Sequence, residues 1–307
     1  MAKLIVASAP HLHSGDQIRF VMRDVAVALL PACCAAVYFF GWRALWMLLA
    51  GAGSAVFWEW LLTRKKSNAV ADGSAAVTGL LLALVLPPTL PLWQIPVASL
   101  IAIGLGKQIF GGLGYNPFNP ALIGRAALLA SWPAAMTSWV WPRGAALGTD
   151  ALTSATPLAL AKYQGLQVSY ARLFWGNVAG SLGETSAFAI LLGAGYLIVK
   201  RRIDVRIPLC YLGTVFILTA LWGQDPIFHL LAGGLLLGAF FMATDYVTSP
   251  VTGRGRIYFG VGCGVLTVLI RLFGGYPEGV NYAILLMNAA SPLLERWTMP
   301  GRRSAHA

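Results

Sequence analysis

The sequence predicts an all-α polytopic membrane protein, with about ten transmembrane helices in two inverted five-helix repeats that include broken helices. Its composition points to lipid, because 58% of the 307 residues are hydrophobic and 11% are charged, whereas soluble domains carry about 25% charged residues. Apolar runs long enough to cross a bilayer recur along the chain. One long polar segment divides these runs into two sets of five, so the second set begins on the opposite side of the membrane from the first.

Ten apolar runs justify the helices in order. They lie near residues 24–41, 43–63, 71–87, 95–110 and 118–136, and near residues 182–200, 207–223, 227–243, 257–273 and 279–296. The third, fourth and eighth runs contain glycine and proline, so we expect short or broken helices there, which need protein or water around their backbone. The predicted parts are an N-terminal arm (1–23), a first five-helix repeat (24–136), an outer loop (137–181), a second five-helix repeat (182–297) and a tail (298–307).

The basic residues predict the orientation of the chain. With the N-terminus inside and ten spans, sixteen of the 22 lysines and arginines fall on the cytoplasmic side and six on the other. This is the positive-inside bias, so we interpret the net charge of +11 as a topology signal and not as a nucleic-acid site. Residues 1–23 contain no apolar core, and we expect no cleavable signal peptide. We therefore expect both termini to be cytoplasmic and residues 137–181 to lie on the outer, periplasmic side.

A small polar motif runs from Asp150 to Leu158 within the outer loop. It resembles the sites at which bacterial flavin transferases attach FMN, through its phosphate, to a threonine hydroxyl, which here is that of Thr156. Such an ester needs an accessible hydroxyl with small neighbours, and Pro157 keeps the site irregular. The alternative is an ordinary helix start, capped by Thr153 or Ser154.

Two carboxylates at the ends of apolar runs are candidates for an ion pathway. Asp72 opens the third run and Asp245 closes the eighth, at corresponding positions of an inverted repeat. A charge in a membrane segment costs roughly 2–4 kcal/mol unless it is paired or hydrated. Asp72 has an alternative role as a helix cap. Asp245 lies at a helix C-terminus, where a carboxylate is unfavourable, so we expect a partner, with Arg254 and Arg256 nearest in sequence.

The glycine-rich segment before the fifth run holds further polar candidates. Asn116 and Asn119 could cap the fifth helix, contact the polar edge of an isoalloxazine ring, or offer carbonyl oxygens to sodium. Arg125 has no carboxylate close in sequence, so its partner is either a flavin phosphate or reduced flavin anion, or a salt bridge with Glu184 or Asp150.

The remaining polar residues give no catalytic or metal motif, and we predict neither kind of site. Cysteine spacing favours small core residues, and His229 is expected to be a core or interface residue. The sequence contains no Walker loop, Rossmann fingerprint or HExxH, so the chain is not a self-contained hydrolase or ATPase. Four glutamates near predicted span ends are expected to be interfacial, namely Glu59, Glu184, Glu278 and Glu295.

Four motifs in order carry a family resemblance: residues 72–88, residues 110–121, the motif around Thr156, and residues 241–250. Together they resemble the D subunit of the Rnf complex, whose paralogue is the B subunit of the sodium-pumping NADH:quinone reductase. The short N-terminal arm favours the Rnf side. Ser154 stands where many members have glycine, a change that should leave the threonine accessible.

The resemblance implies a ten-helix inverted-repeat subunit with FMN bonded to Thr156, not catalytic alone, in a complex that links ferredoxin and NAD to sodium or proton translocation. It implies the A, B, C, E and G subunits of that complex as partners, bearing another covalent FMN and iron–sulfur clusters, together with a flavin transferase and membrane lipid. It also leaves room for a second, non-covalent flavin such as riboflavin. The further candidates for flavin contact are Asp150, Ser154, Arg125, Asn116 and Asn119.

Two alternatives from other classes remain. A transporter or channel of inverted-repeat fold would use Asp72, Asp245 and the Asn-Pro turns as a substrate path with no redox centre. A membrane scaffold would hold other redox subunits, and a Thr156→Ala change would then leave electron flow intact.

Overall fold

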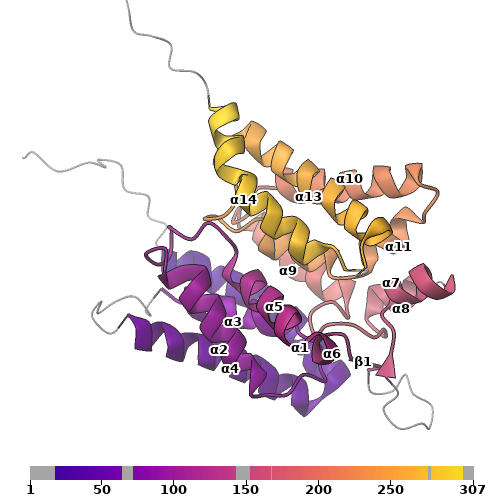
Figure 1. Cartoon of the computed structure of the whole chain (residues 1–307), viewed down its shortest axis with the longest axis horizontal. Coiled ribbons are helices and arrows are strands. Elements are labelled where there is room, and N and C mark those ends of the chain that lie inside the picture. Colours follow the sequence, from indigo (N-terminus) through magenta and orange to yellow (C-terminus); the bar gives the residue numbers. More distant parts are fainter. Residues whose placement is uncertain (1–17, 64–71, 143–152, 167, 276–277, 300–307) are drawn as a thin grey trace, which may run out of the picture.

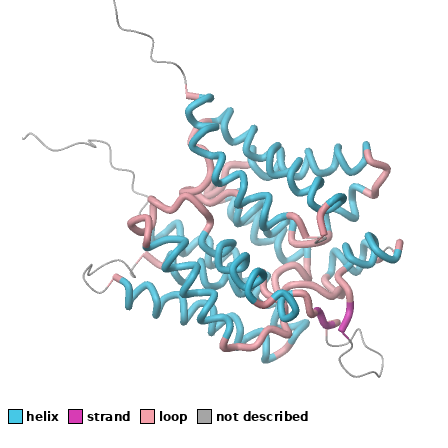
Figure 2. The backbone as a smooth tube through the Cα atoms, in the orientation of Figure 1, coloured by secondary structure: helices cyan, strands magenta, loops and turns pink. Residues whose placement is uncertain are grey.

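A computed structural model describes residues 18–63, 72–142, 153–166, 168–275 and 278–299. Over these ranges the chain is mostly helical, as predicted (Figure 2). The exception is one antiparallel pairing of two residues on each side, β1 (Trp139–Val140) with β2 (Thr153–Ser154).

The first part of the chain folds into helices that follow the first five apolar runs. They are α1 (Ile18–Phe40), α2 (Trp42–Leu62), α3 (Ser74–Leu84), α4 (Gln94–Ile103), the π-helix η1 (Gly104–Gln108), α5 (Pro120–Ser131) and α6 (Pro133–Met136). The glycine-rich segment between η1 and α5 turns sharply, because Gly111, Gly112 and Gly114 have φ values of 115°, 105° and 97°, a region that favours glycine.

The second part begins with short elements and continues with longer helices. These are α7 (Pro157–Ala159), the π-helix η2 (Leu160–Gln164), α8 (Tyr170–Trp175), α9 (Ala187–Val199), α10 (Arg206–Leu221), α11 (Pro226–Leu231), α12 (Leu235–Leu237), the π-helix η3 (Gly238–Met242), α13 (Gly253–Phe273) and α14 (Val280–Thr298).

Helix length supports a membrane protein and bears on the ten-span prediction. In the described ranges three helices, α1, α2 and α13, are long and apolar enough to cross a membrane, and four shorter apolar helices are α3, α5, α9 and α10. Each predicted run contains helix, but the ten-span inverted repeat stays a prediction. The third, fourth and eighth runs are short or interrupted, as expected. The eighth is divided into α11, α12 and η3 around Gly233 and Gly234, whose φ values are 70° and 67°.

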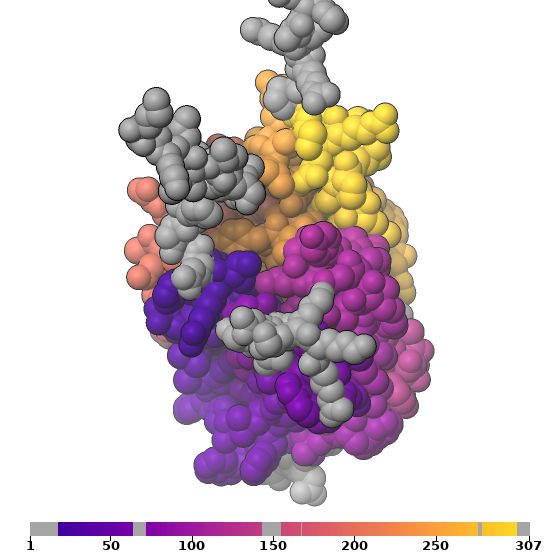
Figure 3. Space-filling view, turned by 90° about the vertical axis from the view of Figure 1, so that its left-hand side faces the viewer, coloured from indigo at the N-terminus to yellow at the C-terminus, as the bar shows by residue number. Residues whose placement is uncertain are grey.

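The helices form two groups that meet along a shared core. Figure 1 shows α1–α6 in one half of the molecule and α9–α14 in the other, and the surface in Figure 3 shows the same division by colour. Between the groups α1 packs on α9 and α5 packs on α14. Within the first group α2 and α3 approach closely, since a Cβ on Gly51 would lie 2.6 Å from the Gly79 carbonyl oxygen. The core draws apolar side chains from both groups.

Candidate cofactor and ion sites

Thr156 stands at the junction between the short strand pair and a helix. The strand β2 ends at Ser154, and α7 begins at Pro157, which needs no backbone donor at the first position of a helix. The Thr156 hydroxyl Oγ1 accepts a hydrogen bond from the Ala159 N–H at 3.3 Å, so Thr156 itself caps α7. The expected alternative caps, Thr153 and Ser154, lie in the strand instead.

The segment after Thr156 is docked on the broken eighth region and on α13. Leu158 packs against Gly233, where a side chain would leave it no room. The Lys162 ammonium donates to the carbonyl oxygens of Arg271 at 2.7 Å and Gly274 at 2.6 Å, at the C-terminal end of α13. Burial lowers the pKa of this lysine. The C-terminal carbonyls of α13 therefore hold the Thr156 segment in place.

Thr156 is 4% exposed, which differs from the accessible hydroxyl that the sequence led us to expect. The reason is tertiary: Leu158 and the capping bond draw the start of α7 into the protein. Asp150 lies outside the described residues, and of Ser154 only the backbone strand is described. Flavin contacts by these two residues stay predictions.

Among the described residues the ion-pair partner of Arg125 is Glu278 and not the predicted Glu184, while the other predicted partner, Asp150, lies outside the described residues. The Arg125 Nη2 pairs with Glu278, and its Nε donates to the Val85 carbonyl oxygen at 2.9 Å, at the C-terminal end of α3. Glu184 lies against Gly234, whose missing side chain leaves room for this carboxylate. Glu278 and Arg125 are 153 residues apart, so no local signal pointed to this pair.

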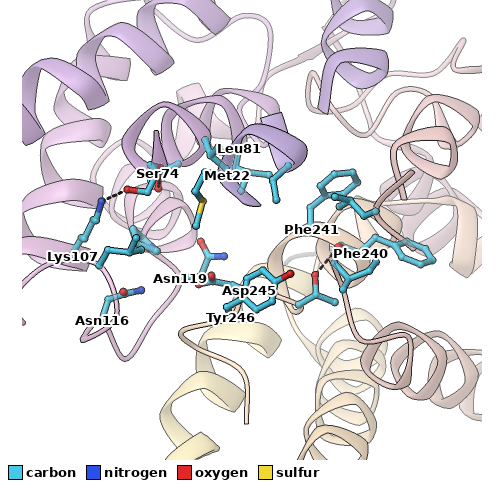
Figure 4. A pocket seen from close by; sticks show the side chains of 18 residues that line it. Met22, Ser74, Leu81, Lys107, Asn116, Asn119, Phe240, Phe241, Asp245 and Tyr246 are labelled. Atoms are coloured by element: carbon cyan, nitrogen blue, oxygen red, sulfur yellow. Dashed lines mark hydrogen bonds between the residues drawn. The ribbon is translucent and has the colours of Figure 1, made fainter. Parts of the chain in front are cut away.

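A cavity of about 70 Å³ lies between α1, α3, the segment before α5, and η3. Its polar lining includes Asn116, Asn119 and Asp245, while Phe240 and Phe241 supply apolar walls. In Figure 4 Asn119 and Asp245 lie near the middle, with Ser74 and Lys107 on one side and the two phenylalanines on the other. Asn119 caps α5 through the N–H groups of the next turn, as predicted, and also donates to the Met242 carbonyl oxygen at 3.3 Å.

Asn116 supplies a free acceptor to this cavity. Its Nδ2 donates to the Phe118 carbonyl oxygen at 3.1 Å, but its buried Oδ1 has no hydrogen-bond partner among the described residues. An amide oxygen and the Asp245 carboxylate are both hard oxygen ligands, the type that a small cation prefers. The lining therefore suits water or a small cation.

The two carboxylates proposed for an ion path, Asp245 and Asp72, have local partners in the structure. The Asp245 carboxylate accepts from the Thr248 hydroxyl at 3.2 Å, while Arg256, one of the two arginines nearest to it in sequence, pairs with Asp204. Asp72 accepts from the N–H of Ser74 at 2.9 Å and from its hydroxyl at 2.7 Å, so it acts at the start of α3, the alternative that the sequence left open.

A buried ion pair beside the cavity was missed from sequence. The Lys107 ammonium lies 2.5 Å from Glu59 Oε1 and 2.6 Å from the Ser74 hydroxyl, and Lys107 and Glu59 are each 1% exposed. Gln108 also donates to Glu59, at 2.9 Å, from the widened π-turn η1. Glu59 was predicted to be interfacial, and that was wrong because α4 and η1 pack over it. Opposite charges in the second and fourth apolar runs were the available signal.

Other polar predictions have mixed outcomes. His229 is buried, and its backbone carbonyl oxygen accepts from Arg271 at 2.6 Å, as fits a core residue. Cys33 and Cys263 are buried as expected, but Cys34 is exposed, because it lies on the outward face of α1. All four cysteines are free.

The cavity has room for small polar groups. Its volume of about 70 Å³ takes a few water molecules, or one cation with water. The second, non-covalent flavin stays a prediction, and nothing below depends on it.

Comparison with known proteins places the chain in a family. The sequence profile of the NQR2, RnfD, RnfE family matches residues 5–303. The chain belongs to this family. Its membership fits the long apolar helices α1, α2 and α13, and it confirms the resemblance drawn from the four motifs.

Several curated relatives cover almost the whole chain. It is 50% identical over 302 residues to the D subunit of the Na(+)-translocating ferredoxin:NAD(+) oxidoreductase complex of Acetobacterium woodii (96% of this chain, 93% of the relative). It is 46% identical over 314 residues to the D subunit of the proton-translocating ferredoxin:NAD(+) oxidoreductase complex of Clostridium ljungdahlii (96% and 94%). It is 43% identical over 321 residues to the D subunit of the ion-translocating oxidoreductase complex of Stutzerimonas stutzeri (91% and 90%). The relatives are thus named as subunits of ion-translocating oxidoreductase complexes.

Proposed function

We propose that this chain is the membrane electron-transfer subunit of an ion-translocating ferredoxin:NAD oxidoreductase complex, and that it carries FMN on Thr156. The observation that carries the proposal is the similarity, over 96% of the chain, to two proteins named as the D subunits of such complexes. Electron transfer needs a cofactor, because side chains lack redox chemistry of this kind. Thr156 is the residue whose motif matches a flavin acceptor.

The local geometry of Thr156 supports flavin attachment, on the condition that the transfer precedes docking of the segment. The residue has an extended backbone, with φ −64° and ψ 156°, ahead of a proline, and its oxygen points along the start of a helix, where the positive end of the dipole favours a phosphate. Because the hydroxyl is buried, we propose that flavin transfer takes place before α7 docks on Gly233 and α13. Lys162 and the Ala159 N–H, which caps α7, both lie within six residues after the threonine that would carry the phosphate.

The ion would move through the cavity lined by Asn116 and Asp245. Its oxygen ligands and its volume of about 70 Å³ suit a partly dehydrated cation or a short file of water. The nearby Lys107 ammonium pairs with Glu59 at 2.5 Å. Asp72 reaches this region through Ser74, which bonds both to Asp72 and to Lys107. The two predicted ion-path carboxylates therefore flank one group of polar residues.

Which ion moves is not decided by overall similarity. The relative named as sodium-translocating is 50% identical and the one named as proton-translocating is 46% identical, and both align over 96% of this chain. Selectivity must then depend on a few residues or on other subunits. Exchange of Asn116 for aspartate, which adds a carboxylate to the cavity, is a direct way to alter it.

We propose two inverted five-helix repeats in a bacterial inner membrane, with cytoplasmic termini and a periplasmic Thr156 segment. The A, B, C, E and G subunits of the complex would be the partners, and a flavin transferase would mature the protein. The periplasmic placement puts Thr156 on the same side as a partner subunit that carries a covalent flavin.

Flavin fluorescence in a denaturing gel tests the proposal. The chain is expressed with a flavin transferase beside Thr156→Val and, as a matched control in the same segment, Thr153→Val. We expect a fluorescent band for the parent and for Thr153→Val, and none for Thr156→Val. A band that persists in Thr156→Val would move the attachment elsewhere. No band in any variant, with a transferase active on another substrate, would favour a transporter without a redox centre.

A further inference from the structure

A pocket rich in arginine lies at the connection between α9 and α10, outside the flavin and ion sites. Its charged lining is Arg201, Arg202, Asp204, Arg206 and Arg256. The polar side chains of Thr244, Tyr246 and Ser249 complete the wall on the other side. The cavity has a volume of about 480 Å³, within the roughly 300–1,000 Å³ of small-molecule sites.

The pocket carries more positive than negative charge. Asp204 is its one acidic lining residue, and two arginines share it: Arg256 Nη1 lies 2.5 Å from Oδ2 and Arg206 Nε lies 4.0 Å from Oδ1. Arg202 pairs with Asp24 at 2.7 Å. Arg201 takes part in no ion pair among the residues that the structure describes. The described carboxylates thus leave about two guanidinium charges in excess, an attractive field for an anion.

The backbone adds to this charge from two long helices. Helix α10 has 16 residues and begins at Arg206, and α13 has 21 residues and begins at Gly253. Gly253 lies directly against the Arg206 guanidinium, so the two helix starts are close together. The positive ends of both helix dipoles therefore lie beside the arginines, where an anion gains most from them.

Exposed apolar side chains lie close in sequence to residues of the lining. Val199 is 82% exposed, Leu209 is 66% exposed and Val251 is 71% exposed, and each lies two residues from a residue of the lining. A soluble phosphate has no apolar part that could contact these side chains. A phospholipid needs both parts, a cationic recess for its headgroup and apolar surface for its acyl chains.

We propose that this arginine pocket binds the headgroup phosphate of an anionic phospholipid, with the acyl chains along Val199, Leu209 and Val251. Basic pockets between helices on the cytoplasmic side of a membrane are typical sites for such headgroups. The predicted positive-inside orientation places this one on that side. The site is separate from Thr156 and from the cavity at Asp245, so it does not depend on the flavin.

Lipid retention tests the proposal. The full-length protein is purified in detergent, exchanged into phosphatidylglycerol or phosphatidylcholine, and the lipid molecules that stay bound are counted by native mass spectrometry. The test variant is Arg201→Gln with Arg206→Gln. The matched control is Arg19→Gln with Arg296→Gln, which removes the same charge from two exposed residues outside the pocket. We expect about tenfold weaker retention of phosphatidylglycerol in the test variant, and no change in the control.

Two outcomes of this experiment would overturn the proposal. Equal loss in the test and control variants would mean that net charge, and not the pocket, holds the lipid. Displacement of phosphatidylglycerol by millimolar glycerol phosphate, with equal retention of phosphatidylcholine, would mean that the occupant is a soluble phosphate. If the double variant does not fold, Arg201→Gln alone, at an exposed side chain, answers the same question by a smaller loss of phosphatidylglycerol.

Discussion

Two buried arginines, Arg125 and Arg271, both donate to backbone carbonyl groups at a helix end but differ in their charged partners. Arg125, on α5, donates to the Val85 carbonyl oxygen at the end of α3 and pairs with Glu278. Arg271, on α13, donates to the carbonyl oxygens of His229, Ala232 and Gly233 at the end of α11, and has no carboxylate partner among the described residues. Each holds the C-terminal end of an interrupted helix.

The difference shows two ways to keep a cation inside an apolar protein. The last carbonyl groups of a helix have no partner within the helix and carry partial negative charge. Arg271 is held by hydrogen bonds to these carbonyl groups, without an ion pair among the described residues, and is 3% exposed, while Arg125 is 5% exposed and adds a full charge pair. A helix that ends inside the protein therefore offers free carbonyl groups to a buried arginine. In the middle of a continuous helix these groups are already bonded within the helix. Three substitutions sharpen this comparison.

The largest effect is expected at Arg125. Arg125→Met leaves the Glu278 carboxylate without its partner, and loss of one member of a buried pair costs about 3–5 kcal/mol. The free energy of unfolding in detergent measures this loss. A second change, Glu278→Gln, should recover a large part of it, because no stranded charge then remains. Absence of recovery would mean that Arg125 acts through Val85 alone.

A smaller effect is expected at Arg271. Arg271→Met leaves two or three carbonyl oxygens without a donor, at a combined cost of roughly 2–3 kcal/mol in the same unfolding measurement. Glu278→Gln should give no recovery in this variant, since Arg271 has no ion pair with Glu278. The conservative variant Arg271→Lys should lose less, because an ammonium can still donate to these carbonyls. A recovery by Glu278→Gln would remove the distinction between the two arginines.

The smallest effect is expected at Asp204, the carboxylate partner of an arginine near the surface. Burial opposes the charge on Asp204, but hydrogen bonds from the Arg206 N–H and from Arg256 outweigh it and hold the pKa below the usual 3.8. Because the folded-state pKa is the lower one, the stabilisation is present above pH 3.8 and is lost as pH falls through the folded-state pKa. Thermal unfolding between pH 6 and pH 3 should show a loss of about 1 kcal/mol or less. Asp204→Asn should remove this pH dependence.

The candidate sites could be predicted from sequence only where their residues are local. The Asn119 cap and the three short or broken helical regions depend on neighbours within a few residues, and the structure shows each of them. The pairs Arg125–Glu278 and Lys107–Glu59 join residues 153 and 48 positions apart. Their spacing carries no periodic signal, so the sequence shows opposite charges in apolar runs but not which of them pair.

The sequence by itself determined that this is a helical membrane protein of a known family, because composition and motif order are properties of the chain alone. The tertiary structure decided that Thr156 is buried, that Asp245 bonds to Thr248, and that Arg256 pairs with Asp204. The physical reason is that burial and charge pairing depend on which segments pack together. This chain has few charged residues, and the helices that pack around each one determine how buried it is and with which group it pairs.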